Sequence, residues 1–131
     1  MRNAPLILIA DDEPGFLEIL GVKLKRNGFL VAEAHDGKEA VEKALNLKPE
    51  LIVMDINMPN ENGTEAVLDI VKNPETKETK IVFFTSMKEP WPAFKKDSPQ
   101  VAKELGVAEF LNKTNDLDKI VEKIKNLLRK S

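Results

Sequence analysis

Three aspartates in this sequence follow short apolar runs, and their side chains could act together in chemistry. Asp11 and Asp12 follow the apolar residues 6–10, and Asp55 follows the apolar residues 51–54. Runs of this kind are typical of strands buried on both faces of a parallel sheet, and open α/β sheets bind ligands where such strands end. A single aspartate at a strand end is more often a turn former or a helix cap. It is therefore the pairing of Asp55 with Asp11 and Asp12 that indicates a site.

A cluster of these carboxylates would require a cation. Like charges raise one another's pKa, so the three groups stay ionised together only if positive charge lies between them. The chain has no cysteine and a single histidine, His35, so a zinc site is not expected. Oxygen donors alone select a hard ion, and a site that keeps several waters is typical of Mg²⁺. We expect Asp11, Asp12 and Asp55 to hold Mg²⁺; the alternative is that Asp11 and Asp12 only cap a helix.

Two further strand ends would add a hydroxyl and an ammonium group. Thr85 ends the strand-like run 80–85, and Lys113 follows the run 108–112. With Asp55 as nucleophile, Thr85 and Lys113 could neutralise charge on a transferred phosphoryl group together with Mg²⁺. Taken singly, Thr85 could reflect strand propensity and Lys113 an ordinary surface charge. As a set, these groups favour phosphoryl transfer.

The elements that must position these residues alternate along the chain. Hydrophobic periodicity and turn residues predict strands at 5–10, 29–34, 51–54, 80–85 and 108–112. They predict helices at 14–27, from Asp36 to just before Pro49, around 66–71, at 99–105 and from Asn115 onward. This alternation predicts an α/β fold, a doubly wound, flavodoxin-like parallel sheet of five strands with helices on both faces. In the order 2-1-3-4-5, the first and third strands are neighbours, so Asp11, Asp12 and Asp55 would converge.

Composition limits the class of protein. The 131 residues fit one domain over residues 1–131. Twenty basic against 22 acidic residues give a net charge of -2, which argues against direct binding to nucleic acid or to an anionic membrane. The apolar run 6–10 is too short for a signal peptide or a membrane span, so a cytoplasmic protein is expected.

Together these motifs resemble the receiver domains of response regulators in two-component signalling, especially the stand-alone chemotaxis and sporulation regulators. The resemblance covers residues 5 to about 129, and the pattern D-x-x-M-P-x-x-x-G is present as Asp55, Met58, Pro59 and Gly63. Chemotaxis receivers are known examples of the 2-1-3-4-5 order, so the expected order rests partly on this resemblance.

The resemblance also implies a role for each matching residue. Asp11 and Asp12 match the acids that hold Mg²⁺, Asp55 the phosphoacceptor, and Asn57 the residue whose backbone carbonyl binds the metal. Thr85 matches the conserved hydroxyl, Phe110 the aromatic switch residue and Lys113 the invariant lysine. Two departures are that Thr114 replaces the usual proline, and that the proline-rich segment 86–97 is longer than expected. We expect Trp91 in this segment either to anchor it or to bind a partner.

The function implied is that of a phosphorylation switch. Asp55 would take a phosphoryl group from a phosphohistidine on a sensor histidine kinase or a phosphotransfer protein, and the change would alter binding to an output partner. Such a domain would catalyse only its own phosphorylation and dephosphorylation, as a monomer or a phosphorylation-dependent dimer. We expect His35 to be a solvent-facing turn residue rather than a phosphodonor.

Three other functions are compatible with parts of the pattern. A haloacid-dehalogenase-type phosphohydrolase needs an acid two residues after its nucleophile, where this chain has Asn57. An FMN-binding flavodoxin would place phosphate at residues 10–15, where three acids would repel it. A degenerate receiver that only binds partners would not need the matched site residues. Incubation with acetyl phosphate and Mg²⁺ separates these classes, because a receiver retains the phosphoryl group that a phosphatase releases.

Overall fold

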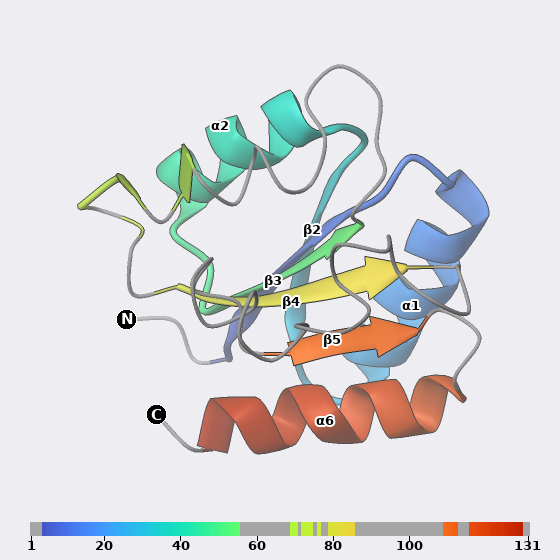
Figure 1. Cartoon of the computed structure of the whole chain (residues 1–131). Helices are drawn as coiled ribbons and strands as arrows, with labels where there is room; N and C mark the ends of the chain where they lie inside the picture. The colour runs from blue at the N-terminus through green and yellow to red at the C-terminus, as the bar shows by residue number, and fades with distance from the viewer. Residues whose placement is uncertain are drawn as a thin grey trace, which may run out of the picture.

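A five-stranded parallel sheet forms the centre of the molecule (Figure 1). The computed structural model describes residues 4–55, 69–70, 72–74, 76, 79–85, 109–112 and 116–129. The strands are β1 (Leu6–Ala10), β2 (Leu30–Ala34), β3 (Leu51–Asp55), β4 (Lys80–Thr85) and β5 (Glu109–Asn112). Their order is β2-β1-β3-β4-β5, which confirms the predicted order and the adjacency of the first and third strands.

Three described helices cover the two faces of this sheet. They are α1 (Pro14–Arg26), α2 (Gly37–Leu47) and α6 (Leu117–Arg129). Figure 1 shows α2 on one face and α1 with α6 on the other, as expected for a doubly wound sheet. The helix predicted around 66–71 lies mostly outside the described residues, and the one predicted at 99–105 lies wholly outside them. Within the described part of the chain, no helix is long and apolar enough to cross a membrane.

The sheet separates two hydrophobic cores, because successive side chains of a strand point to opposite faces. The core under α2, here called the α2-side core, contains Leu8, Ala10, Ala34, Ala40, Ala44, Ile52, Met54, Ile70, Ile81 and Phe83. The core under α1 and α6, the α1/α6-side core, contains Ile7, Ile9, Leu17, Leu20, Leu24, Leu51, Val53, Val82, Phe84, Ile120, Val121 and Ile124. Both cores take alternate residues from β1, β3 and β4, which explains why these strands read as continuous apolar runs.

Local signals set the ends of α1. Pro14 lies in the first turn, where its missing N–H costs no helical hydrogen bond. At the other end Asn27 N donates to Leu24 O at 3.0 Å, and Gly28 has a φ of 90°, a left-handed conformation that favours glycine. Phe29 N also donates to Leu24 O, at 3.1 Å, so Phe29 belongs to the helix-ending turn and β2 begins at Leu30.

The start of α2 is capped by Asp36, the residue at which the sequence predicted this helix to begin. The Oδ1 atom of Asp36 accepts a hydrogen bond from Glu39 N at 2.8 Å and thereby satisfies one of the unpaired N–H groups of the first turn. The helix ends at Leu47, followed by Lys48 with a left-handed φ of 49°, before Pro49. This capped turn directs the chain from the end of β2 into α2. The end of β2 lies beside the end of β1, since Ala34 pairs with Ala10.

Candidate functional site

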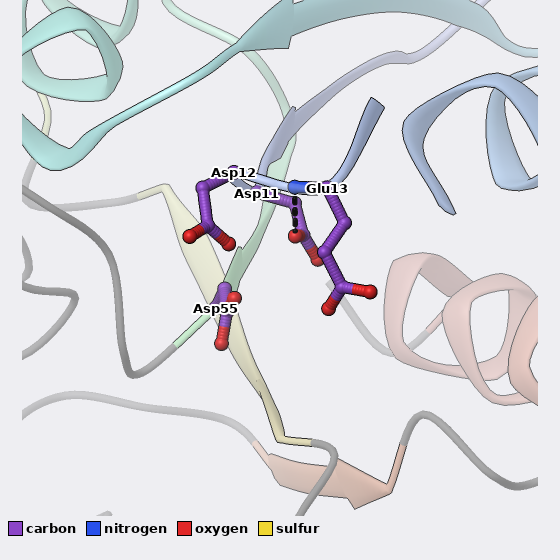
Figure 2. Close-up of side chains that lie close together, drawn as sticks. All are labelled: Asp11, Asp12, Glu13 and Asp55. Atoms are coloured by element: carbon purple, nitrogen blue, oxygen red, sulfur yellow. Dashed lines mark hydrogen bonds between the residues drawn. The ribbon is translucent and has the colours of Figure 1, made fainter. Parts of the chain in front are cut away.

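Four carboxylates gather at the carboxyl edge of the sheet (Figure 2). Asp11, Asp12, Glu13 and Asp55 each offer one oxygen, and these oxygens all lie within 4.8 Å of one another. Asp11 is 1% exposed and Asp55 6% exposed, whereas Asp12 and Glu13 are exposed. The cluster therefore has two buried acids at its base and two acids at its mouth, and it confirms the predicted convergence of Asp11, Asp12 and Asp55.

Strand register brings the two buried acids together. Ile9 pairs with Val53 and Ala10 with Met54, so the chain positions that follow on the two strands, Asp11 and Asp55, come side by side. Ile9 and Val53 both belong to the α1/α6-side core. Because successive side chains of a strand point to opposite faces, Asp11 and Asp55 lie on the same face as Ile9 and Val53. They are the last residues on this face before the edge of the sheet.

Asp11 is held in place by two hydrogen bonds to neighbouring elements. Its backbone N donates to Ala34 O at 3.0 Å, which joins the end of β1 to the end of β2. Its Oδ1 atom accepts a hydrogen bond from Glu13 N at 2.9 Å, the dashed line in Figure 2. Asp11 thus connects the sheet to the segment that starts α1.

The alternative that Asp11 and Asp12 only cap the first helix is not supported. The N-cap residue of α1 is Glu13, and its side chain makes no capping hydrogen bond. Leu17 N donates to Glu13 O at 3.1 Å, so the first turn of α1 is formed by a backbone hydrogen bond to Glu13. The carboxylate of Asp11 accepts a hydrogen bond from Glu13 N. Because Glu13 is the N-cap residue and precedes the first helical residue, this bond does not cap α1.

Glu13 is a member of the cluster that the sequence analysis did not assign to the site. Its position directly after two acids was the available signal. Whether a third consecutive acid reaches the same site depends on how the chain turns from β1 into α1, and spacing alone does not fix that turn.

The donor set fits a hard divalent cation. The clustered ligand atoms are all carboxylate oxygens, which suit Mg²⁺ or Ca²⁺ rather than a metal that prefers nitrogen or sulfur ligands. Gathering four carboxylates also creates repulsion, which a divalent ion would relieve. The buried acids would contact such an ion from the protein side. The exposed acids lie at the opening of the site, which water and substrate can reach.

The other predicted site residues are placed only in part. Asp55 pairs with Phe84, and Thr85 is the next residue of β4, so the Thr85 backbone lies beside the acidic cluster. Thr85 pairs with Asn112, and Phe110 pairs with Phe83 on the same two strands. The side chains of Thr85 and Phe110 lie outside what the structure describes, as do Asn57, Lys113, Thr114 and the segment 86–97 with Trp91.

His35 is exposed beyond the end of β2, as the sequence analysis expected. Its ring Nδ1 lies 3.0 Å from the Oε1 atom of Glu39, and its backbone N donates to the same oxygen at 2.6 Å. The backbone hydrogen bond is the main cause that lowers the pKa of Glu39 below its ordinary value of 4.5; the imidazole and Lys43 also contribute. His35 therefore has a local partner at the start of α2.

Comparisons with known proteins agree on one family. The family model for the response regulator receiver domain matches residues 7–125. The alkaline phosphatase synthesis transcriptional regulatory protein PhoP of Bacillus subtilis is 30% identical over 129 residues, which cover 95% of this chain and 49% of PhoP. Protein PilH of Pseudomonas aeruginosa is 29% identical over 123 residues, covering 93% of this chain and 96% of PilH. The chain thus spans about half of PhoP but nearly all of PilH.

Solved structures show the same relationship. The chemotaxis response regulator CheY4 of Vibrio cholerae superposes with a TM-score of 0.83 at 25% identity, covering 95% of this chain and 99% of that chain. A LuxR-family two-component response regulator from Aurantimonas superposes with a TM-score of 0.81 at 27% identity, covering 97% of this chain and 86% of that one.

Proposed function

Because this chain belongs to the response regulator receiver domain family, we propose that it is a phosphoacceptor and that Asp55 is the residue that accepts the phosphoryl group. The observation that carries the proposal is the position of Asp55: it is the buried carboxylate at the end of β3, in a cluster with three other acids. A nucleophilic carboxylate needs an open approach on one side and fixed neighbours on the other. The edge of the sheet supplies the approach, and the flanking strands β1 and β4 supply the neighbours.

The acidic residues around Asp55 would hold Mg²⁺. Asp12 and Asp55 are proposed to bind the ion directly and Asp11 through a water molecule, and the backbone carbonyl of Asn57 is proposed as a further ligand. When bound, the ion neutralises charge on the clustered carboxylates and on the oxygens of the transferred phosphoryl group. Glu13 lies within reach of the same cluster and would add negative charge near its mouth.

The transfer itself exchanges one bond for another at phosphorus. An oxygen of Asp55 attacks the phosphorus in line, the O–P bond forms, and the N–P bond of the phosphohistidine donor breaks, so that the donor imidazole leaves. Thr85 is proposed to donate its hydroxyl hydrogen to a phosphoryl oxygen, and Lys113 to pair its ammonium with another. The product is an acyl phosphate on Asp55.

The proposed phosphodonor is a sensor histidine kinase or a phosphotransfer protein. Phosphorylation would change the position of Thr85 and the packing of Phe110, and would alter a partner surface that includes Trp91. The domain would act as a monomer or a phosphorylation-dependent dimer and would not contact nucleic acid directly. A haloacid-dehalogenase-type phosphohydrolase is not favoured, since the chain matches receivers and residue 57 is an asparagine.

The assignment of Asp55 predicts that Asp55→Asn abolishes stable phosphorylation, because an amide cannot supply the nucleophilic oxygen. The protein and the variant would be incubated with acetyl phosphate and Mg²⁺, and the acid-labile phosphate would be measured by intact mass. The exposed Asp69 offers a matched control, because Asp69→Asn makes the same chemical change away from the site. Phosphate retained by Asp55→Asn at unchanged yield would remove Asp55 as the acceptor.

A further inference from the structure

A pair of phenylalanine rings lies on the side of Asp55 opposite Asp11. Asp55 on β3 has β1 as one neighbour and β4 as the other, and its register partner on β4 is Phe84. Phe84 is fully buried in the α1/α6-side core, on the same face as Asp55 by alternation. The ring of Phe16, from α1, meets the ring of Phe84 edge-to-face, with centroids 5.6 Å apart and planes at 71°.

A single short segment of chain therefore includes Asp11, on one side of the proposed phosphoacceptor, and contacts Phe84, on the other side. Asp11 flanks Asp55 on the β1 side, and its carboxylate is bonded to Glu13 N. Phe16 follows three residues later, in the first turns of α1, and fixes the ring that flanks Asp55 on the β4 side. The turn from β1 into α1 thus links the metal-binding acids to the aromatic neighbour of the nucleophile.

We propose that Phe16 is a positioning residue for phosphoryl transfer at Asp55, acting through Phe84; this inference rests on the proposed role of Asp55. Edge-to-face aromatic pairs have a preferred geometry, so Phe16 restricts the orientation of the Phe84 ring. That ring fills the space beside Asp55 and offers no strong hydrogen-bond partner that could draw the carboxylate toward β4. The restriction favours carboxylate orientations directed at the acidic cluster and the incoming phosphorus.

Loss of the Phe16 ring would affect Asp55 and leave the other acids of the proposed metal site, Asp11 and Asp12, in place. Phe16→Ala removes the edge contact and leaves space into which the Phe84 ring can turn, so Asp55 gains conformations that do not align for in-line attack. Small misplacements of a reacting group are costly, and we expect the rate of phosphorylation by acetyl phosphate to fall roughly tenfold. Asp11 and Asp12 keep their backbone positions, so any loss of Mg²⁺ affinity through Asp55 should be much smaller than the loss of rate.

The chain provides a matched control in Phe29. Phe29 is also partly buried against the α1/α6-side core, but it lies just before the first residue of β2, at the opposite end of the strands from the acids. Phe29→Ala therefore removes the same ring from the same core without altering the surroundings of Asp55. A third variant, Phe16→Leu, restores apolar volume without an aromatic edge, and should recover part of the rate if Phe16→Ala folds poorly.

The experiment compares three measurements for the four proteins: the unfolding midpoint, Mg²⁺ affinity by calorimetry, and the phosphorylation rate with acetyl phosphate at saturating Mg²⁺. The inference is supported if Phe16→Ala and Phe29→Ala lose similar stability, while at saturating Mg²⁺ only Phe16→Ala is slow and Phe16→Leu is intermediate. It is overturned if Phe16→Ala and Phe29→Ala react at the same rate, or if Mg²⁺ affinity falls in Phe16→Ala by as large a factor as the rate. Failure of the wild-type protein to be phosphorylated would instead contradict the proposed function.

Discussion

Asp11 and Asp12 are neighbours in the chain but have different surroundings. Asp11 is buried and one of its oxygens accepts the N–H of Glu13, whereas Asp12 is exposed at the mouth of the cluster. A carboxylate already committed to a backbone hydrogen bond has fewer lone pairs to offer a metal. We therefore expect Asp11 mainly to fix the turn and Asp12 mainly to bind the ion.

This division predicts that Asp12→Ala weakens Mg²⁺ binding more than Asp11→Ala does. It agrees with the family resemblance, which places Asp12 in direct contact with the metal and Asp11 behind a water. Titration calorimetry with Mg²⁺ measures both affinities, and Asp11→Asn, which keeps an acceptor for Glu13 N, is the control for lost structure. Equal loss of affinity in the two alanine variants would contradict the ranking.

The convergence of Asp11, Asp12 and Asp55 could be predicted from the sequence because it depends only on strand order. Acids that end neighbouring parallel strands must meet at one edge. The inclusion of Glu13 and the aromatic pair at Phe84 could not be predicted in the same way. Both depend on the path of the chain between β1 and α1, and on the rotation of α1 over the sheet, which hydrophobic periodicity leaves undetermined.

The elements follow from the sequence most closely where both faces of a strand are buried. β4 has the predicted bounds, and β1 and β3 each differ from their predicted bounds by one residue. The edge strands differ more in character: β2 is partly exposed along most of its length and starts one residue late, because Phe29 completes the turn after α1. The helix predicted from Asn115 onward is present as α6, in which Ile120, Val121 and Ile124 are buried against the sheet.

The N-terminus of α2 provides a test at the scale of one element. Asp36→Ala should lower the free energy of unfolding by about 1 kcal/mol, because Glu39 N loses its side-chain acceptor. Urea denaturation measures the change, and Asp36→Asn is the matched control, since asparagine is also a good N-cap residue. If the alanine and asparagine variants unfold at the same urea concentration, the cap contributes nothing measurable.

At the scale of the whole molecule, β4 joins the edge of the sheet that carries the acids to the proposed partner surface. Thr85 is the last residue of β4 and the segment 86–97 follows it directly in the sequence, so we expect a shift of Thr85 toward a phosphoryl group to be passed to that segment. Trp91 in this segment is the only tryptophan of the chain, so its emission reports on one place.

We expect beryllofluoride with Mg²⁺, which imitates the acyl phosphate, to change the fluorescence emission of Trp91. The physical reason is the new set of acceptor atoms on Asp55, fluorines in the mimic and oxygens in the acyl phosphate, which attracts the Thr85 hydroxyl and moves the residues attached to it. Asp55→Asn treated with the same reagents is the control and should show no change. An unchanged spectrum in a protein whose Asp55 is shown to be modified would mean that the switch does not pass through this segment.

The separation of the two cores by the sheet also affects how such a sequence can diverge. The buried acids Asp11 and Asp55 and the ring of Phe84 continue the rows of side chains that face α1 and α6, while the α2-side core takes the alternate residues of the same strands. Substitutions such as Ile to Val or Met to Leu under α2 can therefore accumulate during evolution with their cost confined to stability. Substitutions under α1 and α6 are selected for fold and phosphorylation chemistry at once, so this half of the interior is expected to change more slowly among descendants of the gene.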